Sequence, residues 1–402
     1  MKRAFALLLL FAVVSSCAAC GQPMPPKEVK CENVLSAGGG AESLTKALGK
    51  AKAGDCVVLE DGTYTGGFVV PPGVTLTTGL DEEAEVEGKS EGEPALTLRE
   101  GAALWDVSVR RAAGIAVFVP SAVASIGEVQ IKEAEVAAIA IACTGSTCRE
   151  GDNEISIHDA EVTGNELGIW ASGARVSLVG GVIADQNTTR LTGGHGVVAA
   201  DGAELTMMGT LVESNHAVGV LVDGQGGTQA TLSGVTVRGN QGRGVWVQRL
   251  SSTLAEPGVT LVDGTLVDGN KIVGIGLVES TGVVVSDSEI RNTVLTPTVT
   301  GETGTTPVAD GLGIFKNSGD VRVQGVYFVE NQRTQILIDA GGTGIELLDS
   351  TLAVTGQDRW GVVIQQTTNT VDDPECLVCQ IPIPHDPLPI ADREIPIPEV
   401  PL

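Results

Sequence analysis

The sequence predicts an all-β solenoid, in which parallel strands wind into a single-stranded β-helix of about ten to eleven coils. Three observations support this fold class. A seven-residue pattern recurs along the chain, short strands of alternating apolar residues flank its copies, and the 402 residues include 53 Gly but only 6 Phe, 4 Trp and 2 Tyr. So much glycine with so few large rings indicates many tight turns around a thin aliphatic core.

The repeated pattern ends in asparagine. It reads Gly or Asp, a small or β-branched residue, any residue, an apolar residue, two further residues and Asn. We expect each Asn to adopt a left-handed backbone and to bond its amide to the Asn amide one coil along. Six full copies and one shortened copy, Asp287 to Asn292, are present; the full copies run 159–165, 181–187, 209–215, 234–240, 264–270 and 325–331.

Each repeat carries three strands of period two. One precedes the pattern, as at residues 321–323, one lies within it, and one begins at a Gly that follows the Asn, as at residues 219–222. A unit of 22 to 30 residues cannot bury its apolar face alone. Stacking the coils about 4.8 Å apart solves this by forming parallel sheets around a dry interior.

These residues resemble the right-handed parallel β-helix, pectate-lyase-like families, whose second turn carries an Asn ladder. The resemblance covers roughly residues 39 to 370. Its front end is a short amphipathic helix, Ser43 to Lys52, followed by a strand at 56–59 and a Gly-Thr-Tyr turn at 62–64, which look like the N-terminal cap and first coil of such proteins. The fold hosts lyases, hydrolases, epimerases, adhesins and inert spikes, so it implies little about activity.

The sequence predicts four segments: a signal peptide at 1–16, a lipidated linker at 17–38, the β-helix at 39–370 and a Pro-rich tail at 371–402. Lys2 and Arg3 precede an apolar run too short to span a bilayer. That run ends in Val-Ser-Ser-Cys17, which resembles a bacterial lipobox and implies a diacylated Cys17.

Cys20 is the alternative lipidated residue, because cleavage there would leave six cysteines that pair evenly. No Asp follows either cysteine, and the sorting pattern it resembles implies an outer-membrane lipoprotein on the periplasmic or cell-surface side. The formal charge of −25 excludes nucleic acid as a partner and argues against adhesion to anionic lipid by charge. Membrane attachment must therefore come from the lipid.

The remaining cysteines predict disulfides by proximity in the sequence: Cys31 with Cys56, Cys143 with Cys148, and Cys376 with Cys379. The Cys376-Leu-Val-Cys379 spacing also suggests a redox or zinc site, but no second Cys pair or His cluster supports one, so we expect no metal. The tail uses Ile-Pro-Ile-Pro twice, at 381–384 and 395–398, which predicts an extended chain that is free or docks as a C-terminal cover.

Candidate catalytic residues are few. Phasing the strands predicts an outward column, in which only Asp263 and Asp287 are carboxylates on adjacent coils; the others are His158, Gly180, Met208, Ser233 and Gln324. Two carboxylates make a weak calcium centre of the lyase type, so Ca²⁺ is expected only if the protein is such an enzyme, and otherwise no cofactor. His195 lies in a Gly-His-Gly like that of polygalacturonases, but the other motifs of those enzymes are missing, and we interpret it as a turn residue.

A second polar group lies beside the Thr-rich insertion at 293–310 and comprises Asp310, Lys316, Glu330 and Arg333. Loops on rigid scaffolds often carry function, but solvated charges on an acidic surface explain these four as well.

One surface feature predicts binding. The middle residue of each third strand should point outward, and Trp170, Val198, Leu221 and Trp246 then form an apolar stripe, which continues as Gly276, Gly313 and Leu337. Three contacts remain open for it: sugar rings, a partner protein of the envelope, or the chain's own Ile-Pro tail. The favoured hypothesis is a lipid-anchored envelope protein whose rod presents a non-catalytic binding or structural surface. The alternative is a lyase or glycoside hydrolase that acts on extracellular polysaccharide.

Overall fold

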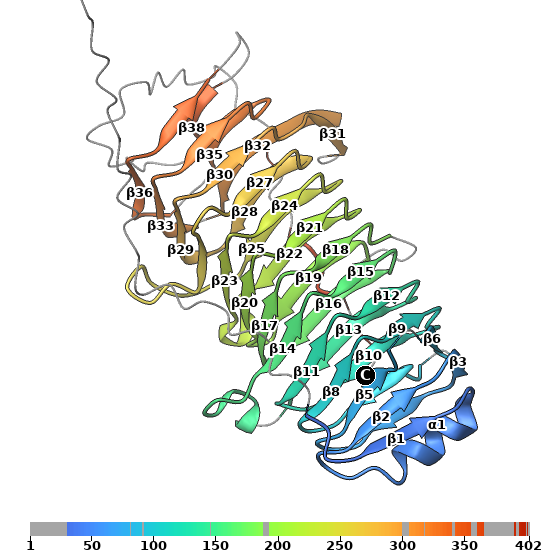
Figure 1. The fold of residues 1–402 in the computed structure, drawn as a ribbon. Helices are drawn as coiled ribbons and strands as arrows, with labels where there is room; N and C mark the ends of the chain where they lie inside the picture. The colour runs from blue at the N-terminus through green and yellow to red at the C-terminus, as the bar shows by residue number, and fades with distance from the viewer. Residues whose placement is uncertain are drawn as a thin grey trace, which may run out of the picture.

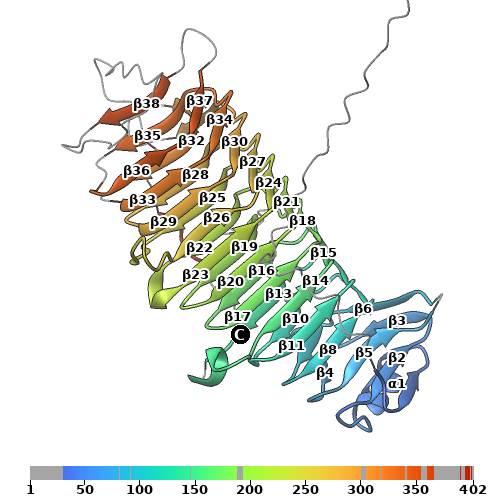
Figure 2. The same cartoon turned by 60° about the vertical axis from the view of Figure 1, so that its left-hand side comes forward.

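The protein forms a rod of parallel β-helix coils (Figure 1). The computed structural model describes residues 30–80, 82–90, 92–144, 146–187, 193–299, 305–316, 318–339, 342–354, 360–365, 390, 394–398 and 400. Along this part of the chain each coil contributes one strand to each of three long sheets (Figure 2).

The first sheet contains 13 strands in the described residues, all parallel. Where a copy of the repeated pattern is present, the strand of this sheet lies just before it. Alternate side chains of these strands point into the rod. In order they are β1 (Val34–Ala37), β2 (Cys56–Leu59), β5 (Thr75–Thr78), β8 (Ala102–Trp105), β11 (Ala124–Gly127), β14 (Ile155–His158), β17 (Arg175–Val179), β20 (Glu204–Met208), β23 (Gln229–Ser233), β26 (Val259–Val262), β29 (Thr281–Ser286), β33 (Gly319–Gln324) and β36 (Ile345–Leu348).

The second sheet contains 12 short strands in the same part of the chain. They lie within the repeated pattern and are β3 (Gly62–Thr65), β6 (Ala84–Glu87), β9 (Ser108–Arg110), β12 (Gln130–Lys132), β15 (Glu161–Thr163), β18 (Val182–Ala184), β21 (Leu211–Glu213), β24 (Thr236–Arg238), β27 (Leu266–Asp268), β30 (Glu289–Arg291), β34 (Tyr327–Val329) and β37 (Thr351–Ala353).

The third sheet follows the Asn turn and carries the predicted stripe. Its parallel strands are β4 (Phe68–Val70), β7 (Leu96–Leu98), β10 (Ile115–Val119), β13 (Ala137–Ala142), β16 (Leu167–Ser172), β19 (His195–Ala200), β22 (Val218–Asp223), β25 (Arg243–Gln248), β28 (Ile272–Val278), β32 (Thr305–Phe315), β35 (Thr334–Asp339) and β38 (Trp360–Gln365). An added strand from the Thr-rich insertion, β31 (Thr296–Val299), pairs antiparallel with β32.

The described rod has about twelve coils, slightly more than the ten to eleven predicted, because the coils that contain β2 to β7 carry no copy of the Asn pattern. A helix, α1 (Ala41–Leu48), lies at the N-terminal end (Figure 1); it begins two residues before and ends four residues before the predicted Ser43 to Lys52. It buries Leu44, Ala47 and Leu48 against the first strands. Two 3₁₀ turns complete the helical content of the described residues, η1 (Ser146–Arg149) and η2 (Gln225–Gly227).

The Asn ladder is present inside the turn between the second and third sheets. Both the backbone N–H and the side-chain Nδ2 of Asn215 donate to Oδ1 of Asn240, at 3.0 and 2.9 Å. Asn240 donates in the same way to Asn270, at 3.1 and 2.8 Å. Each amide therefore satisfies a backbone group that the turn would otherwise leave buried without a partner.

Two predicted ladder members are wrong by one residue. Gln186, not Asn187, accepts from the Asn165 backbone N–H at 3.0 Å, and Thr293, not Asn292, donates its backbone N–H to Asn331 at 3.1 Å. The left-handed conformation also belongs to the residue before the ladder position, at Gly164, Asp185, Ser214, Gly239, Gly269, Asn292 and Glu330. The ladder position thus carries a buried polar side chain, and the preceding residue makes the turn.

Two predicted disulfides lie within the described residues and both form. Cys31 bonds Cys56 with a Cα–Cα distance of 5.3 Å, and Cys143 bonds Cys148 with a distance of 5.8 Å. The first ties the chain before β1 to the first coil. Cys17, Cys20, Cys376 and Cys379 lie outside the described residues, as does the signal segment.

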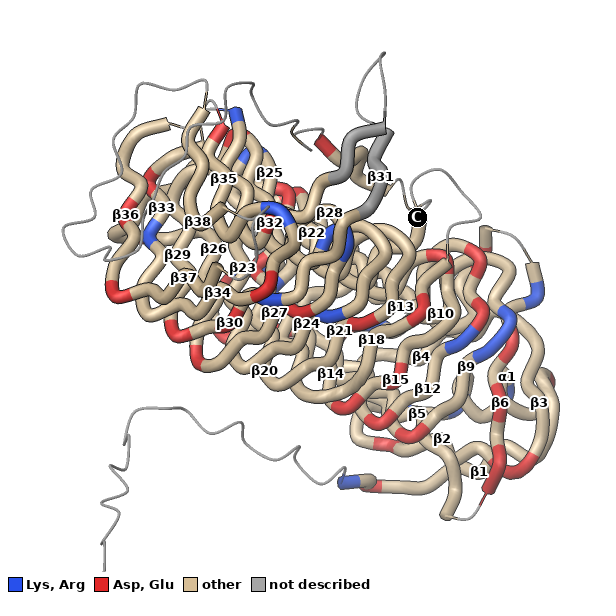
Figure 3. The backbone as a smooth tube through the Cα atoms, turned by 90° about the horizontal axis from the view of Figure 1, so that it is seen from above, with Lys and Arg blue, Asp and Glu red and all other residues tan. Residues whose placement is uncertain are grey.

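Charged residues are spread along the coils, with basic residues set among more numerous acidic ones (Figure 3). Several pair between neighbouring strands. Arg111 Nη2 lies 2.9 Å from Glu85 Oε1, and Arg238 Nε lies 2.7 Å from Glu213 Oε2. Such exposed pairs contribute little individually, but they reduce the repulsion that a charge of −25 creates.

Candidate functional site

The stripe residues stack in one column on the outer face of the third sheet. Strand registers place Trp170, Val198, Leu221 and Trp246 side by side on β16, β19, β22 and β25. The column continues through Gly276, Gly313 and Leu337, as the strand phasing predicts. These residues belong to a hydrophobic cluster distinct from the core inside the coils. We call the first four residues the stripe.

The stripe is buried although it faces outward. Val198, Leu221 and Trp246 are 0% exposed and Trp170 is 6% exposed. Apolar residues from the C-terminal end of the chain pack in the same cluster, namely Ile390, Ile395, Ile397 and Val400. We call residues 394–398 and 400 the C-terminal segment. Of the three contacts that the sequence left open for the stripe, the structure contains the one with the chain's own tail.

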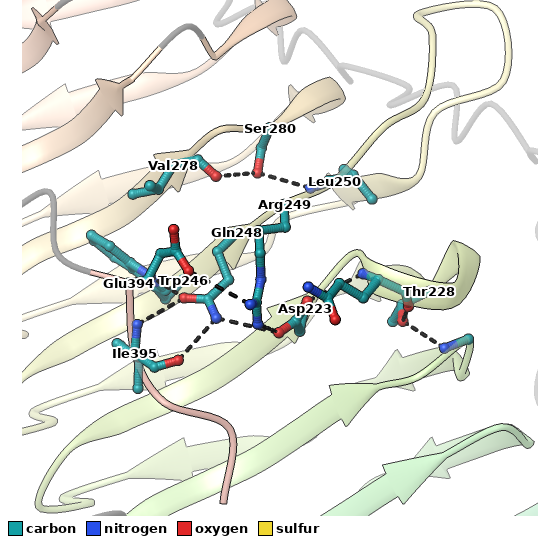
Figure 4. Close-up of polar contacts among 12 residues, drawn as sticks. Asp223, Thr228, Trp246, Gln248, Arg249, Leu250, Val278, Ser280, Glu394 and Ile395 are labelled. Carbon is teal, nitrogen blue, oxygen red and sulfur yellow. Dashed lines mark hydrogen bonds and ion pairs between the residues drawn. The ribbon is translucent and has the colours of Figure 1, made fainter.

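One glutamine holds the C-terminal segment by its backbone. Gln248 Oε1 accepts the backbone N–H of Ile395 at 2.9 Å, and Gln248 Nε2 donates to the carbonyl of Ile395 at 2.9 Å (Figure 4). The same amide accepts from Trp246 Nε1 at 3.2 Å and donates to Asp223 Oδ2 at 3.3 Å. Both acceptor and both donor positions of the side chain are used, so its orientation is fixed.

A buried carboxylate supports this glutamine. Asp223, 2% exposed, also accepts from the backbone N–H of Gln225 at 3.1 Å and forms an ion pair with Arg249. Arg249 Nη1 lies 3.6 Å from Glu394 Oε2 (Figure 4). Arg249 therefore neutralises a buried carboxylate on the rod and contacts an acidic residue at the start of the C-terminal segment.

Small and large residues fit together along the column. A side chain at Gly276 would overlap the Trp246 ring, and one at Gly313 would overlap the Phe315 ring. The two rings lie 6.3 Å apart, centroid to centroid, and the Arg243 guanidinium lies 4.2 Å from the Trp246 ring centroid. These contacts fix the indole in place beneath the C-terminal segment.

A cavity of about 580 Å³ remains between the C-terminal segment and the coils. From the rod it is lined by Trp170, Asp201, Asp223, Gln225 and Arg249, and from the segment by residues 394–398 and 400. An indole, carboxylates and an amide in one hollow are groups able to contact a small polar ligand.

The weak catalytic candidates occupy turn and core positions. Asp263 and Asp287 lie on adjacent coils as predicted, where Gly264 N–H donates to the carbonyl of Asp287 at 2.8 Å. Both have a left-handed backbone, with φ of 54° and 45°, in the turn between the first and second sheets. His195 is 2% exposed and is the first residue of β19, beside Leu167 on the neighbouring coil.

The predicted strand column was wrong at the turn residues. Registers align His158, Met208, Ser233 and Gln324 in one column, whose other members include Val179, Val262 and Ser286. Gly180, Asp263 and Asp287 come one residue later. The error arose because either Gly or Asp occupies the left-handed turn position that follows the strand. Neither residue type therefore identifies the last residue of the strand.

The polar group near the insertion divides into a buried pair and two turn residues. Arg333 Nε donates to Asp310 Oδ1 at 2.7 Å, and Thr334 Oγ1 donates to the same oxygen at 2.8 Å. Asp310 is 0% and Arg333 6% exposed. Lys316 and Glu330 have positive φ in turns. These contacts explain Asp310 and Arg333 as a structural ion pair that links neighbouring coils.

No group of three or more His, Cys, Asp or Glu residues is placed to hold a metal ion within the part of the chain that the structure describes. Within that same part, no helix is both long and apolar enough to cross a bilayer.

Asp223, Gln248 and Arg249 are functional residues that the sequence patterns did not predict. A signal was available for two of them. Side chains two residues apart on a strand share a face, so Asp223 and Gln248 lie on the same face as Leu221 and Trp246. The pairing of Gln248 with Ile395 had no such signal, because 147 residues separate them.

No family model matches this chain, and no curated protein sequence matches it. Solved structures, in contrast, do match this chain. The chain is similar to the Dettilon tailspike protein gp208, with a TM-score of 0.55, 12% identity and coverage of 81% of this chain and 64% of that protein. It thus spans less than two thirds of the tailspike.

Two further structures align over most of the chain. The A-module of the Azotobacter vinelandii mannuronan C-5 epimerase AlgE4 has a TM-score of 0.46, 14% identity and coverage of 83% of this chain and 96% of that one. Polygalacturonase from Erwinia carotovora ssp. carotovora has a TM-score of 0.45, 12% identity and coverage of 84% and 98%. The neighbours are right-handed parallel β-helix proteins, and the predicted resemblance is confirmed at the level of the fold.

Proposed function

We propose that the protein is a lipid-anchored cell-envelope protein whose β-helix rod presents a non-catalytic binding surface, and that this surface binds extended chain segments along the stripe. The single observation that carries the proposal is the Gln248 amide, which pairs with both backbone groups of Ile395 at 2.9 Å. The outer face of a sheet offers no free backbone groups, because the ladder uses them. Recognition of a peptide backbone there requires a side chain of this kind.

The ligand chemistry follows from the segment now bound. Pro396 and Pro398 have no N–H, so a chain with proline at alternate positions brings few donors that would be left without acceptors against the apolar stripe. Ile395, Ile397 and Val400 supply apolar contact with the stripe. The surface is therefore suited to an extended Ile-Pro-Ile-Pro segment preceded by an acidic residue that faces Arg249.

The roles of the catalytic candidates support a binding protein over an enzyme. Asp263 and Asp287 make turns, and Asp310 is held by Arg333 and Thr334. These turns and this ion pair support the coil structure.

A peptide experiment tests the binding surface. A double variant, Ile395→Asp with Ile397→Asp, should release the C-terminal segment because two charges cannot enter the apolar cluster. A fluorescent peptide with the sequence of residues 394–400 should then bind the rod. Adding Gln248→Ala to this double variant should weaken that binding by about tenfold, since two hydrogen bonds are lost. Equal binding with and without Gln248 would contradict the proposal.

The anchor is tested separately. The lipobox-like Val-Ser-Ser-Cys17 supports acylation at Cys17 with cleavage before it. Mass spectrometry of the N-terminal peptide should find diacylglycerol on Cys17, and Cys17→Ala should release the protein from the membrane fraction while Cys20→Ala should not. The reverse result would assign the lipid to Cys20.

The cavity beside Trp170 favours a second candidate, an enzyme that acts on extracellular polysaccharide. Asp201 and Asp223 line it together with the indole, and carboxylates beside an aromatic ring suit a sugar. The test is incubation with a panel of polysaccharides, with and without Ca²⁺, followed by measurement of new reducing ends and of unsaturated uronates. Product formation that Asp223→Asn abolishes would establish this candidate and overturn the non-catalytic one.

A further inference from the structure

The contacts of the C-terminal segment do not depend on how it is connected to its rod. Its polar partners are the side chain of Gln248 in β25 and that of Arg249, the residue that follows β25. The last described strand, β38, ends at Gln365, and the 24 residues of 366–389 lead from there to Ile390. From β38 to β25 is four strand spacings, roughly 19 Å. A stretch of that length can reach roughly 80 Å when extended, so it is long enough to reach an adjacent rod.

A second copy of this chain carries a ligand that matches the surface. Its C-terminal segment has the same acidic residue for Arg249, the same backbone groups for Gln248 and the same isoleucines for the stripe. Every contact described above could therefore form between two copies as it does within one. The exchange is reciprocal, because each copy offers one segment and one surface, and it closes as a symmetric pair.

We propose that the stripe and Gln248 also receive the C-terminal segment of a second copy, so that two rods are linked by exchanged tails. This inference rests on the proposed binding surface. Two properties of the chain favour contact through tails over contact along the rods. Each copy carries a charge of −25, which opposes side-by-side packing. Anchoring in one membrane would raise the local concentration of tails around each rod.

Mixing two full-length variants tests the exchange. The first, the surface variant, carries Leu221→Ala with Gln248→Ala and keeps an intact tail. The second, the tail variant, carries Ile395→Asp with Ile397→Asp and keeps an intact surface. Neither variant can pair with itself. In a 1:1 mixture the intact tail of the first should bind the intact surface of the second, and light scattering in detergent should detect a 1:1 complex with twice the protein mass of either variant.

The control combines all four substitutions in one chain, which disables both its surface and its tail. Mixed with the surface variant, this chain should form no complex. A complex that does form there would place the contact elsewhere and overturn the inference.

The peptide experiment separates the two proposals. The first outcome is that the 394–400 peptide binds the tail variant, but the mixture of variants stays monomeric at protein concentrations up to a hundredfold above the peptide's dissociation constant. In that case the exchange between copies is wrong and the proposed binding surface stands. If the peptide also fails to bind a tail variant that keeps the β-sheet circular dichroism of the parent rod and melts cooperatively, both proposals fail.

Discussion

The outer face of the third sheet differs between its N-terminal end and its middle, although one column of residues runs through both regions. Near the N-terminus the column contains Val69, which is 47% exposed, and Phe118, which is half-buried. From Trp170 to Trp246 the column is buried. The interior of the coils is equally apolar in both regions. The coil therefore determines which residues face outward, whereas a segment distant in sequence determines which of these outward residues are covered.

The largest expected effect comes from truncating the covered column. Trp246→Ala should lower the free energy of unfolding by about 3–5 kcal/mol, because it empties a fully buried ring site in contact with Phe315. The matched change in the uncovered region, Val69→Ala, should cost less than about 1 kcal/mol, because Val69 is 47% exposed. Urea unfolding of both variants measures the difference. Equal losses would mean that the C-terminal segment does not bury the stripe.

Filling the column should also distinguish the two regions. Gly276→Ala adds a methyl group that overlaps Trp246, and it should destabilise the rod by about 1–3 kcal/mol. Thr97→Ile, which also enlarges a side chain but in the uncovered part of the same column, should change stability by less than about 0.5 kcal/mol. Thermal melts report both. A neutral Gly276→Ala would show that the ring has room to move.

Releasing the C-terminal segment should give water access to the stripe, as it already has to the N-terminal part of the column. Ile395→Asp should cost about 1–2 kcal/mol and shift tryptophan emission to longer wavelength, because water gains access to the stripe. Pro396→Ala is the matched control, since Pro396 is exposed. Unchanged emission in the Ile395→Asp variant would contradict the assignment of this segment as the cover.

The smallest effect is expected from the ion pair at the start of the segment. Glu394→Gln should cost about 0–1 kcal/mol, because Glu394 is exposed and Arg249 keeps its bond to Asp223. The loss should disappear at high salt. A loss above about 2 kcal/mol would indicate that Arg249 depends on Glu394 more than on Asp223.

Most of the fold could be predicted because it is periodic. The Asn pattern located the turns, and strand alternation located the stripe column correctly, including its continuation to Leu337. Errors arose where residues of different types fill the same structural position. Gln186 replaces Asn in the ladder because its amide reaches the same groups, at 2.8 Å from the carbonyl of Val162. Asp263 and Gly180 share a turn position because either residue adopts positive φ there.

The site was only half predictable. Alternation in a strand reveals that Trp170 and Trp246 face outward, and the same rule could have revealed Asp223 and Gln248. The cover could not be assigned, because no period connects residues 394–400 with a coil 147 residues earlier. Recognition there depends on one amide that pairs with a backbone, and a backbone has no sequence signature.

Hydrogen exchange at the amide of Ile395 tests the central claim most directly. If Gln248 holds this amide at 2.9 Å, it should exchange at least tenfold more slowly than an unstructured amide, and Gln248→Ala should remove that protection while the ladder amides of Asn215 and Asn240 stay protected. Exchange of Ile395 at the unstructured rate in the unaltered protein, with a stable rod beneath it, would contradict the account.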